Sequence, residues 1–152
     1  MSVPHLLLAT SIMTMLAVPD APVKWTFGAA ELANGQVRVD LSAEMEKGWH
    51  LYATHLSSDQ GPIPTTITFE ADEAYYLVDS LKEPEPEMAD DPNFGMVLHF
   101  HSNTVVFNQV IARRSTTSFT VKGQVEYMAC NDRMCLPPVR VPFTIDVPAL
   151  SK

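Results

Sequence analysis

Hydrophobic and polar residues alternate along several short segments of the chain, which is the spacing of β-strands with one buried face. In residues 36–43, Val37, Val39 and Leu41 alternate with polar residues. The Asn34-Gly35 pair before this segment is typical of a tight turn, so we expect a hairpin there. The pattern predicts strands at residues 23–27, 36–43, 47–54, 65–70, 96–100, 104–111, 118–129 and 139–147. Roughly seven to nine such strands predict an all-β fold, an immunoglobulin-like β-sandwich.

Two segments interrupt the alternation. Residues 61–64 (GPIP) carry prolines that indicate a bend or an edge strand at this point. Residues 83–92 contain five carboxylates and three prolines without apolar periodicity, so we expect an exposed loop or an extended connection. Phe94 follows this acidic segment. A loop phenylalanine usually packs into the nearest core and less often covers a site.

The composition fits one globular domain: 152 residues, of which 46% are hydrophobic and 18% charged. The chain has 10 Lys and Arg against 18 Asp and Glu, a net charge of -8. This balance argues against nucleic acid or an anionic membrane as a partner, because both select for clustered basic residues. No arrangement of Ser, His and Asp indicates a hydrolase, and no glycine-rich segment indicates a phosphate or nucleotide site.

An apolar run, Leu6–Val18, lies near the start of the sequence. Its 13 residues are too few to span a bilayer comfortably, but they suit the hydrophobic region of a secretory signal. We therefore expect residues 1–21 to be an export signal or an N-terminal anchor, with a buried N-terminal segment as the alternative. Residues 22–152 are then the folded domain.

The two cysteines, Cys130 and Cys135, lie in the segment VEYMACNDRMCLPP between the last two predicted strands, where a disulfide can form. The residues alone leave three interpretations open. A structural disulfide would stabilise the fold little, because the loop that it closes is short. In a redox-active pair, Arg133 would favour a thiolate and Asp132 would oppose it. A metal site would add some of the histidines His50, His55, His99 and His101.

Five segments, taken in order, resemble the periplasmic N-terminal domain of the thiol:disulfide interchange protein DsbD. They are PVKWTF at 22–27, EKGWHLY at 46–52, GPIPT at 61–65, DPNF at 91–94 and EYMACNDRMCLPP at 126–138. The resemblance covers nearly the whole chain after residue 21. It implies an immunoglobulin-like fold with a cap loop over a dithiol site, and neither a cofactor nor a metal.

In this family a membrane-embedded section passes reducing equivalents to a thioredoxin-like domain, which reduces the N-terminal domain, which in turn reduces periplasmic thiol proteins. The resemblance thus implies a periplasmic carrier in a protein-disulfide reductase system, with a link to cytochrome c biogenesis. Cys135 matches the cysteine that forms mixed disulfides with partners, and Cys130 matches the resolving cysteine. The alternative is a non-catalytic β-sandwich binding module braced by a structural disulfide.

The resemblance also implies roles for residues around the cysteines. Phe94 matches the phenylalanine of the cap loop, here residues 90–95, which shields the disulfide until a partner displaces it. Asp90 and Asp91 occupy the acidic position of this loop, where carboxylates raise thiol pKa values. His50 and Tyr52 fall where the family has aromatic residues beside the cysteines.

The sequence departs from the family pattern at two points. Four residues separate the cysteines, whereas the best-known members have five. Residues 22–152 include neither a membrane-embedded section nor a thioredoxin-like domain. We therefore expect the electron donor and the membrane-embedded reductase section to lie elsewhere, in the same or in a separate chain.

Overall fold

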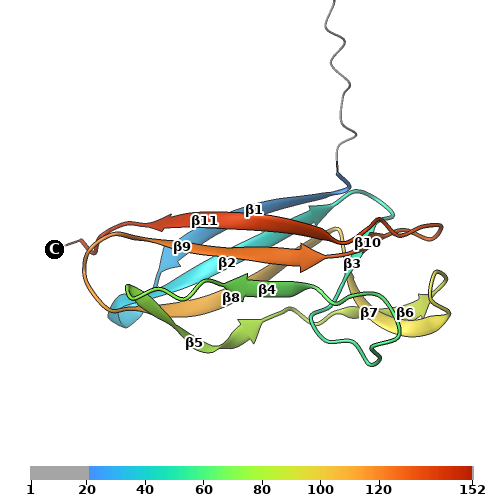
Figure 1. Ribbon diagram of the computed structural model, residues 1–152, viewed down its shortest axis with the longest axis horizontal. Helices are drawn as coiled ribbons and strands as arrows, with labels where there is room; N and C mark the ends of the chain where they lie inside the picture. Colours follow the sequence, from blue (N-terminus) through green and yellow to red (C-terminus); the bar gives the residue numbers. More distant parts are fainter. Residues whose placement is uncertain (1–20, 152) are drawn as a thin grey trace, which may run out of the picture.

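The computed structural model describes residues 21–151, which form β-strands and the turns between them (Figure 1). The predicted export signal or anchor, apart from its last residue, lies outside these described residues. Between residues 21 and 151, no helix has the length and apolar character needed to cross a membrane. The elements are β1 (Val23–Glu31), η1 (Ala33–Gly35), β2 (Gln36–Met45), β3 (His50–Tyr52), β4 (Thr66–Phe69), β5 (Tyr75–Lys82), β6 (Glu87–Asp91), β7 (Met96–Ser102), β8 (Thr104–Arg113), β9 (Phe119–Tyr127), β10 (Ala129–Cys130) and β11 (Val139–Val147).

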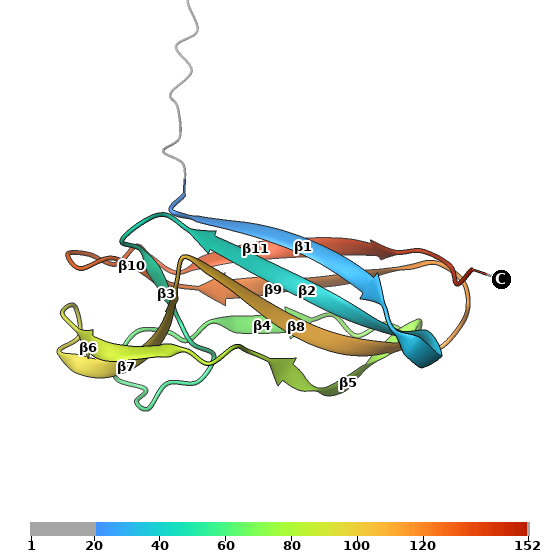
Figure 2. The same cartoon turned by 180° about the vertical axis from the view of Figure 1, so that it is seen from behind.

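Two sheets pack face to face around the main core. One has the strand order β1-β2-β8-β5 and the other β11-β9-β4. Figures 1 and 2 show the two layers from opposite sides. Buried side chains from both sheets form one hydrophobic cluster. The predicted all-β, immunoglobulin-like sandwich is confirmed, and β4, entered through residues 61–64, is an edge strand as its prolines predict.

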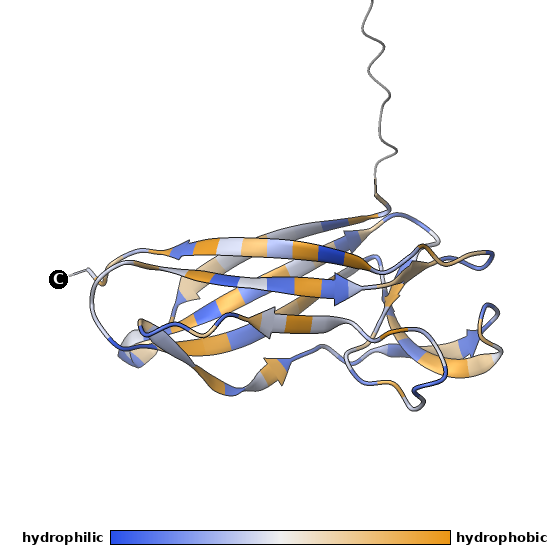
Figure 3. Ribbon diagram, viewed as in Figure 1, coloured by the Kyte–Doolittle hydropathy of each residue, from blue (hydrophilic) through white to orange (hydrophobic). Residues whose placement is uncertain are grey.

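The first hairpin follows the predicted pattern. Val37, Val39 and Leu41 on β2 are each at most 1% exposed, and polar residues alternate with them (Figure 3). β1 pairs antiparallel with β2 through a turn in which Asn34 has φ 60° and Gly35 has φ 73°. Asn and Gly tolerate this left-handed conformation, which explains why the pair marks the turn.

The second sheet contains one position that only glycine can occupy. A Cβ atom at Gly123 on β9 would clash with the carbonyl oxygen of Thr68 on β4, and it would lie 2.5 Å from Cζ of Phe143 on β11. The packing of β4 and β11 on either side of β9 therefore requires a residue without a side chain at position 123.

A third sheet, with the order β10-β3-β7-β6, lies at the end of the sandwich opposite the C-terminus (Figure 1). Here the expectation of a loop at residues 83–92 is wrong in part, because Glu87–Asp91 forms β6 and pairs with β7. β6 is an edge strand with four exposed residues, so it has no apolar alternation. Its charges suit a free strand edge, which they protect from pairing with other chains.

Two further elements differ from the sequence pattern. The pattern predicts no strand at residues 75–82, but β5 forms there with an irregular register between Val78 and Lys82. The buried Gln109 on β8 donates to the carbonyls of Val78 and Asp79 at this irregularity. The strand predicted at 118–129 is also divided, because β9 ends at Tyr127 and β10 pairs with β3 in the third sheet.

Candidate functional site: a disulfide under a cap loop

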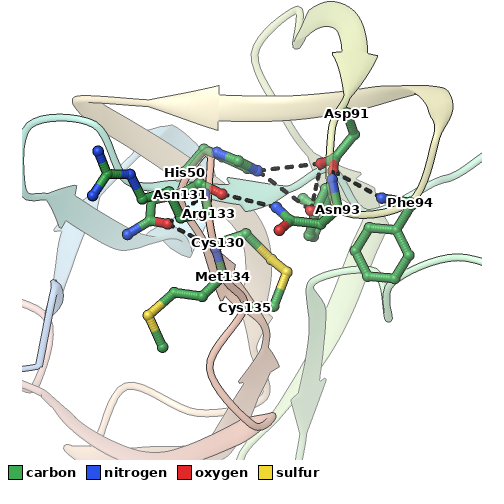
Figure 4. Close-up of a disulfide and its surroundings, with 10 residues drawn as sticks. His50, Asp91, Asn93, Phe94, Cys130, Asn131, Arg133, Met134 and Cys135 are labelled. Carbon is green, nitrogen blue, oxygen red and sulfur yellow. Dashed lines mark hydrogen bonds and ion pairs between the residues drawn. A yellow bond between two sulfur atoms is a disulfide. The ribbon is translucent and has the colours of Figure 1, made fainter.

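The two cysteines form a disulfide at the end of the sandwich (Figure 4). Cys130 is the last residue of β10 and lies opposite His50 on β3. The chain then turns back, so that Cys130 and Cys135 pair in an antiparallel bridge with their Cα atoms 4.0 Å apart. We call residues 130–135 the cysteine hairpin. The prediction that the pair lies in the connection between the last two long strands is confirmed.

Asn131 shapes the tip of the cysteine hairpin. Its backbone N–H donates to the carbonyl of Met134 at 2.9 Å. Its side-chain Oδ1 accepts from the backbone N–H groups of Arg133 and Met134, each at 2.9 Å. Asn commonly bonds to the backbone two or three residues further on, so the local sequence dictates this turn.

The two cysteines differ in exposure. Cys130 is completely buried, in a small cluster with Tyr52 and Leu98. Cys135 is only half-buried and lies at the edge of that cluster. Cys135 is therefore the more accessible of the two cysteines to an incoming thiolate.

Phe94 in the cap loop packs against the same cluster, and its ring meets that of Tyr52 edge-on at 6.1 Å between centroids. The loop closes through a bond from the N–H of Gly95 to the carbonyl of Asp91 at 2.8 Å. Gly95 has φ 65°, a conformation that favours glycine. The aromatic side chain is thus held beside the disulfide by a short, closed turn.

The carboxylate of Asp91, on a residue only 5% exposed, organises the base of the cap loop. Its Oδ1 accepts from the N–H groups of Asn93 at 2.8 Å and Phe94 at 3.3 Å. Its Oδ2 accepts from the hydroxyl of Tyr52 at 2.6 Å and lies 3.5 Å from Nε2 of His50. One side chain therefore connects the cap loop to β3.

Burial governs the protonation of the two β3 side chains. Burial, followed by the hydrogen bond to Asp91, raises the pKa of Tyr52, so its hydroxyl remains a donor at physiological pH. Burial lowers the pKa of His50, although the carboxylates of Asp91, Asp132 and Glu87 act in the opposite direction. Near neutral pH, the imidazole of His50 is therefore neutral.

Sequence comparison decides which family this arrangement represents. The family described as "Thiol:disulfide interchange protein DsbD, N-terminal" matches residues 15–146. The chain belongs to this family. The DsbD N-terminal family is one of thiol-disulfide exchange domains, which agrees with a disulfide held at the protein surface. No curated protein sequence matches the chain.

Solved structures with the same fold include members of this DsbD family. The DsbD N-terminal domain of Neisseria meningitidis in the reduced form has a TM-score of 0.54 at 15% identity, covering 82% of this chain and 86% of that one. The N-terminal periplasmic domain of ScsB from Proteus mirabilis has a TM-score of 0.59 at 18% identity, and the match spans 88% of this chain but 51% of that one. A complex of the DsbD and PilB N-terminal domains from Neisseria meningitidis gives 0.53 at 14% identity, covering 86% of this chain and 87% of that one.

The structure gathers most of the residues that the DsbD resemblance selected. His50, Tyr52, Asp91 and Phe94 all lie around the disulfide. Asp90 is exposed on β6, at the rim of a cleft of about 270 Å³. This cleft lies between the cap loop and the cysteine hairpin and is also lined by Trp49, His50, Asp91, Phe100 and Asp132.

Two of the other candidate histidines, His55 and His101, have side-chain partners away from the disulfide. Nε2 of His101 is 2.7 Å from Glu83, and this pair is largely buried. His55 is exposed and contacts the hydroxyl of Thr54. Among residues 21–151, no three His, Cys, Asp or Glu side chains are grouped to hold a metal ion.

Sequence reasoning missed Asn93 and Asn131, which join the cap loop to the cysteine hairpin. Nδ2 of Asn93 donates to the carbonyl of Asn131 at 2.8 Å. The signal available in the sequence was the position of each asparagine, one beside Phe94 and the other directly after Cys130. Both positions are typical of turns, so neither residue stood out as part of a site.

Proposed function

We propose that the chain is a periplasmic thiol-disulfide exchange carrier. It takes electrons from a thioredoxin-like donor and reduces disulfides of envelope thiol proteins, including those of cytochrome c biogenesis. The observation that carries this proposal is the unequal exposure of the pair, with Cys130 buried and Cys135 half-buried at the edge of the cluster against which Phe94 also packs. A disulfide that only braces the fold has no need for one partly exposed cysteine with a separate loop beside it.

The exchange steps follow from this geometry. A thiolate of the donor attacks Sγ of Cys135, which forms a mixed disulfide and releases Cys130 as a thiolate that takes up a proton. The second thiol of the donor then attacks the donor sulfur of the mixed disulfide and releases Cys135. The donor is left as a disulfide, and the carrier has gained two electrons and two protons.

The second half of the cycle reverses these roles. The Cys135 thiolate attacks the disulfide of a substrate protein and forms a new mixed disulfide, releasing one substrate thiolate. Cys130 then attacks Cys135 and releases the reduced substrate, which restores the disulfide of the carrier. In this scheme Phe94 limits access to Cys135 until a partner surface moves the cap loop. The acidic residues Asp90 and Asp91 raise the thiol pKa values and slow oxidation by other reagents.

The solved relatives support the proposed partners and compartment. One is a periplasmic domain of ScsB, and another is a DsbD N-terminal domain in complex with the N-terminal domain of PilB. By analogy, a thioredoxin-like domain reduces this chain, and a membrane-embedded reductase section supplies that domain. This section lies in the same chain or in a separate one.

Trapping with single-cysteine variants tests the assignment of roles. Cys130→Ala leaves Cys135 free to attack but removes the resolving thiol, so we expect it to accumulate a mixed disulfide with a thioredoxin-like protein in periplasmic extracts. The matched variant Cys135→Ala leaves a buried thiol and should trap little. Equal trapping by both variants would overturn the roles.

A redox titration separates the carrier from the binding module. A reduction potential below roughly -300 mV would mark the disulfide as an inert structural bond and would refute the carrier. The binding module also predicts that Cys135→Ser binds partners as well as the wild type does.

A further inference from the structure

The cap loop contacts the cysteine hairpin through a hydrogen bond that is separate from the packing of Phe94. Asn93, the residue before Phe94, is half-buried, and its Nδ2 lies 2.8 Å from the carbonyl oxygen of Asn131. Figure 4 shows this bond crossing from the loop to the hairpin. Adjacent residues of one loop thus hold the hairpin by two different means, one polar and one apolar.

The acceptor of this bond belongs to the turn that brings the two cysteines together. Asn131 follows Cys130 directly, and its N–H and Oδ1 are used within the cysteine hairpin. Its carbonyl points out of the turn toward the cap loop (Figure 4). Any displacement of the hairpin or of the loop therefore stretches the bond to Asn93.

The donor is equally well fixed. Oδ1 of Asp91 accepts from the backbone N–H of Asn93, and Pro92 restricts the backbone between them. The same carboxylate accepts from the N–H of Phe94 at 3.3 Å. Because Asn93 and Phe94 share this anchor, a motion of the loop that removes the ring from the disulfide also breaks the asparagine bond.

We propose that Asn93 is a positioning residue, which latches the cap loop to the cysteine hairpin and so controls how often Cys135 becomes accessible. The inference rests on the proposed exchange function and adds to it a second, polar barrier to attack. Phe94 packs against the cluster that contains Cys130, and the bond from Asn93 to Asn131 holds Phe94 in place. A partner must therefore break a hydrogen bond as well as displace a ring.

The rate of reduction by dithiothreitol measures this access. One thiolate of the reagent attacks Sγ of Cys135 and releases the Cys130 thiolate. The second thiol of the same dithiothreitol molecule then attacks the dithiothreitol sulfur of the mixed disulfide and releases Cys135. The reagent ends as a cyclic disulfide, and the protein gains two electrons and two protons. Alkylation after an acid quench, followed by mass measurement, gives the second-order rate constant.

Three variants test the latch. Asn93→Ala should raise this rate constant about two- to tenfold, the range expected for loss of one ordinary hydrogen bond. Asn93→Asp should raise it further, because a carboxylate would face the carbonyl of Asn131 with no proton to donate. The matched control Asn108→Ala, on a half-buried β8 residue that takes no part in the site, should leave the rate unchanged. A rate for Asn93→Ala within about 1.5-fold of wild type would overturn the proposal, since even a weak net hydrogen bond changes a population more than this.

A double-mutant cycle shows whether Asn93 acts through Phe94. In a Phe94→Ala background, Asn93→Ala should have no further effect, because no ring remains to be held. Independent, multiplicative effects would refute the latch. The reagent requires no biological partner, so this result is separate from that of the proposed function. A failure to trap a thioredoxin-like protein would refute the carrier while the dithiothreitol rates still tested the latch.

Discussion

Replacing Tyr52 with Phe removes the buried hydrogen bond that ties the base of the cap loop to β3. Tyr52 is fully buried, and its hydroxyl donates to Asp91 at 2.6 Å. The variant keeps the ring but leaves one oxygen of a buried carboxylate without its donor. A hydrogen bond to a charged group contributes about 1.5–3 kcal/mol. We therefore expect the free energy of unfolding to fall by about 2 kcal/mol.

Urea unfolding of the oxidised protein, followed by tryptophan fluorescence, measures this change, which corresponds to a fall in melting temperature of about 5–10 °C for a domain of this size. Tyr76→Phe is the matched control, because Tyr76 is 50% exposed on β5. Removal of its hydroxyl should change the free energy of unfolding by less than about 0.5 kcal/mol. Equal losses in the two variants would refute the reasoning.

The partner of this bond can be tested in the same assay. If Tyr52 and Asp91 act through one hydrogen bond, Asp91→Asn should cost less in the Tyr52→Phe background than in the wild type. Additive effects would show that the two side chains stabilise the protein independently, and the assignment of the energy to their bond would be wrong.

Three other features of the structure lead to predictions of the same kind. Gly123→Ala should lower the free energy of unfolding by about 1–3 kcal/mol, because the added Cβ would clash with both neighbouring strands. The control Gly28→Ala, at a position with open space around it, should change the free energy of unfolding little, and equal effects of the two variants would contradict this prediction. Burial raises the pKa of Glu83, but hydrogen bonds from His101 and Thr54 outweigh this effect and leave the pKa below 4.5. The ionised form therefore stabilises the protein above about pH 4.5, and this stabilisation is lost as the pH falls through the folded-state pKa. Urea unfolding against pH should therefore show a steeper loss below about pH 4.5 for the wild type than for Glu83→Gln, and parallel curves would refute this. An NMR titration should place the pKa of His50 below 6.5, and Asp91→Asn should lower it further, whereas a rise would contradict the contribution assigned to that carboxylate.

The alternation of residues was sufficient to predict the strands that have one buried face. β2 and β8 show it clearly, and the Asn34-Gly35 turn identifies the first hairpin. The same rule could not find β5 or β6, because these edge strands expose most of their side chains. Their positions depend on pairing with β8 and β7, and on the side chain of Gln109, which are tertiary effects.

In the candidate site, too, some residues could be predicted from the sequence and others only from the folded structure. The cysteines, Phe94 and Asp91 could be selected because each matches a family motif. The bond from Asn93 to Asn131 joins residues 38 positions apart, so only the folded arrangement reveals it. The difference in exposure between the cysteines likewise depends on the packing of β3, β7 and β10 against one another.

The cysteine hairpin and cap loop belong to a hydrophobic cluster distinct from the large one between the two main sheets. The small cluster has three fully buried members, Tyr52, Leu98 and Cys130, and its other members are partly exposed. Regions with few buried apolar contacts open at lower free energy than the global unfolding of a domain. Amide hydrogens of the cap loop should therefore exchange with solvent far faster than those of β2 and β8. Such a local unfolding event would expose the disulfide and leave the sandwich intact.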